Sequence, residues 1–77
     1  MNKLRRKALR DIQSKIANVK DVLEEIMMEE EEYRDNIPEN LQGSERYTNA
    51  DEACEFLCEA VSRLEEAVES IETAIEE

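Results

Sequence analysis

Carboxylates are the most numerous chemically active groups of this chain, which holds 21 Asp and Glu, two Cys and no His among its 77 residues. The absence of His excludes imidazole metal ligands and His-based acid–base catalysis. The chain also has one Gly, too few for a Gly-rich phosphate loop, and no nucleophile–base pair can be recognised. The sequence therefore predicts a protein that is not an enzyme and needs no cofactor.

The carboxylates gather in two runs, at residues 24–32 and 51–59. A di-metal helical bundle needs several inward Glu and usually Glu-x-x-His pairs, whereas only Glu30 falls on an inward position here. Residues 35–40 do not match a calcium loop, so we predict no metal site. Two interpretations remain: a solubilising surface, or a negative surface that binds a basic patch on another protein. Carboxylates spaced along a rigid helix resemble DNA phosphates, which bring one charge per ~1.7 Å of duplex axis.

Met28 and Phe56 fall outside the apolar pattern, on positions expected to face solvent among these acids. Single exposed apolar residues are common in soluble proteins. An aromatic residue and a Met ringed by charge also resemble the centre of a protein-binding surface. The predicted partner-binding residues are Glu24, Glu25, Met28, Glu31, Glu32, Glu52, Glu55, Phe56 and Glu59.

The two thiols, Cys54 and Cys58, are four residues apart and would share one helix face. A disulfide between them would strain the backbone. We expect Cys54 to be a small buried residue and Cys58 to lie on its flank. A Cys-only metal site would need further thiolates from a second subunit.

Charge is distributed unevenly along the chain, whose net charge is −11. Residues 1–20 carry a balance of +6, and residues 21–77 carry −17. The basic cluster Lys3 to Arg10 is of a kind that binds phosphate groups, but we expect it to pair with the acidic C-terminus. A chain this acidic is not expected to bind nucleic acid directly.

Apolar residues recur at alternating spacings of three and four, which indicates helices and excludes strands. We predict one domain over residues 1–77, with a first helix at about 3–34, a linker at about 35–43 and a second helix at about 44–76. The short linker makes the helices an antiparallel, all-α hairpin. The predicted seam consists of Leu9, Ile12, Ile16, Val19, Leu23, Ile26 and Tyr33, facing Tyr47, Ala50, Cys54, Leu57, Val61, Leu64, Val68, Ile71 and Ile75.

The linker holds the only Pro and the only Gly of the chain. Asn36 and Glu39 are predicted to form a capping box on a single helical turn. Gly43 is predicted to end that turn in a left-handed conformation, and Ser44 to cap the second helix. The apolar linker residues expected to cover the open end of the hairpin are Ile37 and Leu41.

A third apolar position accompanies each heptad, which is typical of bundle helices rather than of a two-stranded coiled coil. A chain this small is marginally stable alone, so we predict a homodimer that forms a four-helix bundle. The predicted oligomerisation residues are Val22, Ala53, Ala60, Ala67 and Ala74. No apolar run is long enough to cross a bilayer and no signal peptide is recognisable, so a cytoplasmic protein without membrane association is expected.

Residues 35–47 read Asp-Asn-Ile-Pro-Glu-Asn-Leu-Gln-Gly-Ser-Glu-Arg-Tyr. This segment resembles a linker of short, acidic, uncharacterised α-helical hairpin proteins from phages and prophages of Gram-positive bacteria. The flanking Glu-rich helices, with Ala-Val-x-x-Leu-Glu at residues 60–65, are similar to theirs. The resemblance implies an origin in a mobile element and brings no catalytic residue or cofactor.

Small acidic phage proteins often block host defence proteins, and by this analogy we expect a non-enzymatic inhibitor acting in the bacterial cytoplasm on a host protein with a basic surface. Two alternatives remain: a scaffolding oligomer of the phage or prophage, and a sponge for a small anionic ligand.

Overall fold

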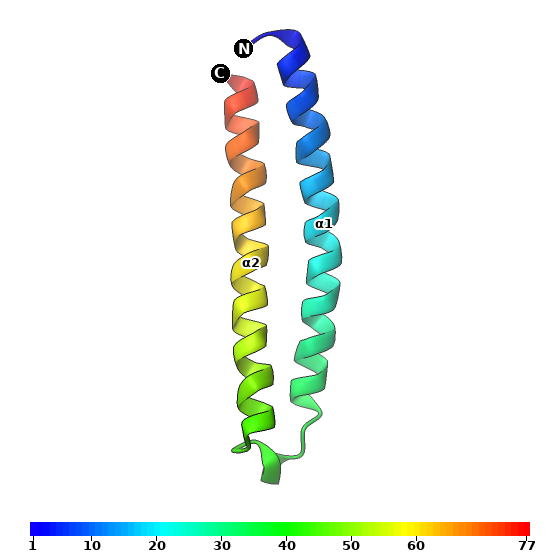
Figure 1. Cartoon of the computed structure of the whole chain (residues 1–77), viewed down its shortest axis with the longest axis vertical. Coiled ribbons are helices and arrows are strands. Elements are labelled where there is room, and N and C mark those ends of the chain that lie inside the picture. Colours follow the sequence, from blue (N-terminus) through cyan, green and yellow to red (C-terminus); the bar gives the residue numbers. More distant parts are fainter.

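Two long helices form the whole architecture of the chain. The computed structural model describes all 77 residues, with α1 at Lys3–Asp35, a short 3₁₀ helix η1 at Glu39–Leu41 and α2 at Glu45–Glu76. Helices account for 88% of the residues, and there are no strands. α1 and α2 lie side by side and antiparallel, with both termini at one end and η1 at the other (Figure 1). The predicted all-α hairpin is confirmed, and each predicted helix boundary lies within one residue of the observed one.

Each long helix begins with a side chain that caps its free backbone amides. The Oδ1 atom of Asn2 accepts from the Arg5 amide at 2.8 Å at the start of α1. The Oγ atom of Ser44 accepts from the Tyr47 amide at 3.3 Å at the start of α2. The Ser44 cap was predicted from the sequence, and the Asn2 cap was not.

The linker differs from its predicted form. α1 continues to Asp35, so Asn36 ends α1 and donates its amide to the Glu32 carbonyl at 3.0 Å. η1 has no side-chain cap, and the predicted capping box is therefore wrong. Gly43 does not have a positive φ, which contradicts the left-handed turn predicted there. Right-handed turns close the linker instead, with the Ser44 amide donating to the Leu41 carbonyl at 3.0 Å.

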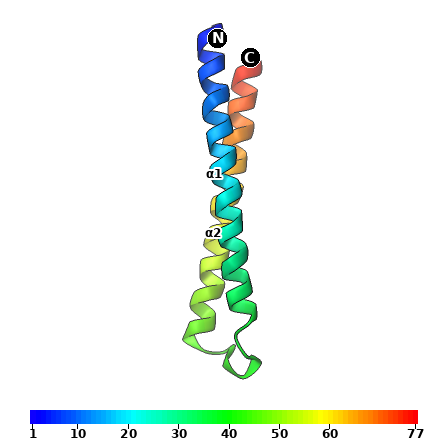
Figure 2. The same ribbon diagram turned by 90° about the vertical axis from the view of Figure 1, so that its right-hand side faces the viewer.

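The hairpin has a thin core. Five residues are buried, and Ile37 is the only one outside α2. The others are Ala50, Cys54, Val61 and Ile75. The Cα atoms span 59 × 16 × 12 Å, and the side view shows one layer of two helices with no third element covering it (Figure 2).

α1 faces α2 with a different set of residues from the one predicted. Ile12, Val19, Ile26 and Tyr33 were expected in the seam, yet Val19 is 60% exposed and Ile26 50% exposed. The half-buried positions include the predicted column of Leu9, Ile16, Leu23 and Glu30, and the neighbouring, mainly polar column of Gln13, Lys20, Met27 and Arg34. The reason is that Lys and Arg can pack their aliphatic stems against an apolar surface while their charged ends reach outward.

Candidate partner-binding surfaces

One edge of the hairpin joins the helices through polar contacts from residues 13, 20 and 34 of α1, which share one heptad column. Gln13 Nε2 donates to Glu72 Oε2 at 2.9 Å, and Lys20 Nζ lies 3.7 Å from Glu65 Oε1. Nearer the loop, Arg34 Nη1 donates to Asp51 Oδ1 at 3.0 Å. We call this side of the molecule the polar edge, and its residues are Gln13, Lys20, Arg34, Asp51, Glu65 and Glu72.

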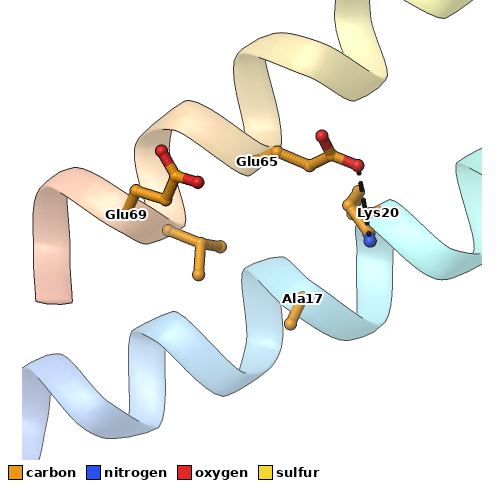
Figure 3. Close-up of a pocket in the computed structure, with 5 residues that line it drawn as sticks. Ala17, Lys20, Glu65 and Glu69 are labelled. Carbon is orange, nitrogen blue, oxygen red and sulfur yellow. Dashed lines mark ion pairs between the residues drawn. The ribbon is translucent and has the colours of Figure 1, made fainter.

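Figure 3 shows a shallow hollow on the polar edge, where the Lys20–Glu65 pair lies beside Ala17 of α1 and Glu69 of α2. Partial burial lowers the pKa of Lys20, but the nearby Glu24 charge and the hydrogen bond to Asp21 outweigh it, so the pKa is raised. The hydrogen bond that Arg34 Nε donates to Asp35 Oδ1 is the largest cause that raises the pKa of Arg34. Both cations of the polar edge therefore stay charged and engaged with carboxylates.

The basic start of α1 was predicted to pair with the acidic end of α2, and the structure shows this pairing for only part of the cluster. Arg10 lies 3.7 Å from Glu72, and Arg6 Nε donates to the Ile75 carbonyl at 3.1 Å, where it satisfies a free carbonyl near the end of α2. Among the cations of residues 1–20, four have neither an ion pair nor a side-chain hydrogen bond to the rest of the chain. They are Lys3, Arg5, Lys7 and Lys15.

Most carboxylates of the predicted partner-binding set lack a cation partner. Glu59 pairs with Arg63, one turn along the same helix. Glu24 and Glu31 are half-buried because they lie one turn from Lys20 and Arg34 beside the polar edge. The exposed acids with no ion pair are Glu25, Glu32, Glu52 and Glu55.

The structure does not gather these acids on one face. Glu25 directly follows the half-buried Glu24, and Glu32 directly follows Glu31. Because one residue turns an α-helix by about 100°, Glu25 and Glu32 occupy the outward side of α1. Glu52 and Glu59 stand on the outward side of α2. These acids surround both helices near the loop, and we call them the acidic collar. Its seven residues are Glu24, Glu25, Glu31, Glu32, Glu52, Glu55 and Glu59.

Met28 and Phe56 are exposed, as predicted from their positions outside the seam. Phe56 is 70% exposed and borders a hollow lined otherwise by Glu59, Ala60 and Arg63, all of α2. Met28 is not part of this hollow. Met28 stands on α1 and Phe56 on α2, so the hollow beside Phe56 is built by α2 alone.

Cys54 is buried and Cys58 is exposed, in agreement with their predicted positions. Burial away from water is the largest cause that raises the pKa of the Cys54 thiol. No group of three or more Cys, Asp or Glu side chains is arranged to hold a metal ion.

An apolar face lies opposite the polar edge. Tyr33 accepts a hydrogen bond at 2.6 Å from Arg46 Nε, and the Arg46 guanidinium stands 5.2 Å from the Tyr33 ring centre. Tyr33 ends a seven-residue column of α1, and Arg46 begins one of α2, so this contact places both columns on one side of the hairpin. The apolar face, as we define it, comprises Ile12, Val19, Val22 and Ile26 of α1 with Ala53, Ala60, Ala67 and Ala74 of α2.

The predicted oligomerisation residues all belong to the apolar face. Val22 is 55% exposed, and the four Ala residues are half-buried. Val19, Val22, Leu23 and Ile26 line an apolar hollow on α1. Sequence reasoning missed Ile12, Val19 and Ile26 as part of this open face because it assigned them to the seam. The sequence held one signal of the true orientation, because Lys20 and Arg34 of α1 could each pair with a carboxylate of α2. These pairs indicate that the polar column of α1 faces α2.

Comparison with protein-family models, curated proteins and solved structures finds no match to this chain. Neither α1 nor α2 combines the length and apolar character that crossing a bilayer demands.

Proposed function

We propose that this hairpin is a non-enzymatic protein-binding module whose acidic collar docks on a basic surface of another protein. The observation that carries the proposal is the shortage of cations around the collar. Residues 21–59 hold 14 acids against Arg34 and Arg46, a balance of −12. Arg34 is engaged by Asp35 and Asp51, and Arg46 by Tyr33, so neither cation neutralises the collar.

A concentration of like charge on one end of a rigid helix pair costs stability and creates a strong negative potential. Such a potential attracts a basic partner and accelerates its association at low salt. Residues 21–35 and 45–59 hold 13 acids on two neighbouring helix segments that each run about 22 Å at ~1.5 Å per residue, which gives one carboxylate per ~1.7 Å of axis, comparable to the phosphate charges along DNA. A nucleic-acid-binding site on the partner is therefore the surface that the acidic collar fits best.

The linker at residues 35–47 supports a phage or prophage origin through its resemblance to proteins of those elements. Within this setting the proposed role is inhibition of a bacterial defence protein in the host cytoplasm. The hairpin occupies the basic site of that protein and contributes no chemical step of its own.

The test compares three forms of the protein as baits in a bacterial host lysate, with retained proteins identified by mass spectrometry. The wild type is expected to retain a basic protein that elutes steeply with salt. A variant with Glu31, Glu32, Glu52 and Glu55 changed to Lys is expected to lose that protein and keep its helical circular dichroism.

The matched control changes Arg5, Arg6 and Lys7 to Gln, at the other end of the hairpin. This control is expected to retain the partner. Equal retention by the charge-reversed variant, or loss by the control alone, would refute the proposal.

Phe56→Ala is expected to weaken partner binding by about 2 kcal/mol or more if this exposed ring anchors the contact.

A scaffolding role is the second candidate, and the open apolar face favours it. Binding through apolar contacts changes little with salt, whereas binding through the acidic collar is lost as salt rises.

The anionic-ligand sponge draws support from the hollow bordered by Lys3, Arg6, Lys7 and Arg10. A rise in melting temperature with inorganic phosphate alone would favour the sponge over both protein-binding roles.

A further inference from the structure

We infer that the apolar face binds a second copy of this chain in an antiparallel arrangement, with α1 packed on α1 of the partner and the two loops at opposite ends. The inference concerns assembly and does not depend on the proposed function. Three observations support it: the exposed area of the hairpin, the distribution of charge along α1, and one pair of opposite charges, Lys15 and Glu29, placed symmetrically about Val22.

The exposed area is larger than a chain of this size normally leaves open. The hairpin exposes 5867 Å². A compact folded monomer of 9.0 kDa exposes roughly 4,850 Å². The excess of about 1,000 Å² is close to the ~800 Å² that each partner contributes to a standard protein interface.

Four of the ten large apolar side chains that the hairpin exposes lie on the apolar face, namely Ile12, Val19, Val22 and Ile26. Figure 2 shows no element over either side of the single helical layer. The polar edge is occupied by the ion pairs of Lys20 and Arg34, whereas Val19, Val22 and Ile26 are each at least half exposed. A second apolar face of the same kind would cover them and convert two helices into a four-helix core.

Charge decides the orientation of the second copy. The loop half of the hairpin, residues 21–59, carries −12, and the remaining residues carry +1. Placing both loops at the same end would bring −12 beside −12. Placing them at opposite ends brings each acidic half beside the nearly neutral half of the partner, which removes that repulsion.

In the favoured orientation α1 lies antiparallel on α1 of the partner. Residues 1–20 carry +6 and residues 21–35 carry −7, so opposite charges meet along both halves of the contact. Within a single helix this distribution is unfavourable, because cations stand at the positive N-terminal end and acids at the negative C-terminal end of the helix dipole. A second antiparallel α1 supplies the counter-charges that the hairpin itself lacks.

One pair of charged residues shares the column of Val22 at the border of the apolar face. Lys15 and Glu29 stand seven residues before and after Val22, and all three are exposed and share one column of α1. Neither Lys15 nor Glu29 forms an ion pair inside the chain. A two-fold axis near Val22 brings Lys15 of each copy beside Glu29 of the other, giving two equivalent ion pairs.

The test is a charge-swap experiment read by sedimentation. The wild type is expected to sediment at twice the 9.0 kDa chain mass at micromolar concentration. Lys15→Glu alone and Glu29→Lys alone each place like charges together twice per dimer, and each is expected to raise the dimer dissociation constant about tenfold or more. An equimolar mixture of the two variants restores both ion pairs and is expected to form a heterodimer with near wild-type affinity.

Lys7→Glu and Glu66→Lys carry the same charge changes on exposed positions outside the apolar face and are expected to change the dimer dissociation constant far less than Lys15→Glu or Glu29→Lys. Circular dichroism confirms that every variant remains helical. A wild-type protein that stays monomeric and folded at millimolar concentration would overturn the inference. A dimer whose mixed variants show no preference for each other would overturn the antiparallel arrangement of α1 on α1.

Discussion

At the residue scale, burial separates side chains that look alike in the sequence. Ile37 and Leu41 are both apolar linker residues, yet Ile37 is 3% exposed and Leu41 is 44% exposed. The sequence predicted that both cover the end of the hairpin. It could not distinguish them because the linker turns follow backbone hydrogen bonds, such as that from Ile37 to Arg34, rather than an apolar period.

Ile37→Ala is expected to lower the free energy of unfolding by about 2–5 kcal/mol, because it empties a closed site in a thin core. Leu41→Ala serves as the matched control in the same linker and is expected to cost about 1 kcal/mol or less. Urea denaturation followed by circular dichroism measures both. Equal losses for the two variants would show that the loop is closed differently.

The two thiols give a second test of burial. Cys58 is expected to react quickly with a thiol reagent at pH 8, whereas Cys54 is expected to react only as the hairpin opens, because its buried thiol has a raised pKa. Kinetics with Cys54→Ala and Cys58→Ser assign each rate. Equally fast labelling of both thiols would contradict the buried position of Cys54.

The raised pKa of Cys54 also has a consequence for stability. The folded state holds this thiol proton more tightly than the unfolded chain does. The contribution of the protonated thiol to the free energy of unfolding is therefore complete below the ordinary pKa of 9.0 and is lost as the pH rises above it. Replacing Cys54 with Ala is expected to remove this part of the alkaline destabilisation.

At the element scale, the helices themselves follow from periodicity, while their mutual orientation does not. Alternating three- and four-residue spacings predicted both helices to within one residue. Leu23 and Leu57, predicted as core residues, are only half-buried. The apolar stripe of α1 is wide enough to offer two columns to α2, and the ion pairs of Lys20 and Arg34 select between them.

Arg34→Gln is expected to lower the melting temperature at low salt, because it removes the contact between α1 and Asp51. The loss is expected to shrink as salt rises and screens the pair. Arg63→Gln is the matched control, since Arg63 pairs with Glu59 within α2 and joins no second helix. If both variants melt alike at low salt, the polar edge does not hold the helices together.

At the scale of the whole molecule, the hairpin has two unlike sides. The polar edge closes one side with ion pairs, and the apolar face leaves the other open. The sequence predicted the wide apolar stripe, but the assignment of Ile12, Val19 and Ile26 to the open side needed the contact between Tyr33 and Arg46. The acidic collar could be named from composition, whereas its distribution around both helices depended on the observed rotation of α1.

Because the dimer proposed above would bury further apolar area, the melting temperature is expected to rise with protein concentration. A hundredfold increase from the micromolar range should shift the transition upward by several degrees for a domain of this size. Val22→Glu, which places a charge in the apolar face, is expected to abolish the shift. A transition that is independent of concentration in the wild type would indicate a folded monomer.

The seven-residue interval of the cross-helix contacts has a consequence for how the chain folds. Apolar columns that repeat every seven residues fit almost equally well when one helix slides by a heptad, so competing misaligned hairpins are close in energy. A slide of one heptad in one direction would set Lys20 beside Cys58 and Arg34 beside Ser44, so that both lose their carboxylates. The opposite slide would set Lys20 beside Glu72 but Arg34 beside Cys58, so that one of the two pairs is lost. The ion pairs of the polar edge thus mainly select the correct register of α1 against α2. A chain that lacks them would fold into a mixture of hairpins in different registers with unchanged helix content.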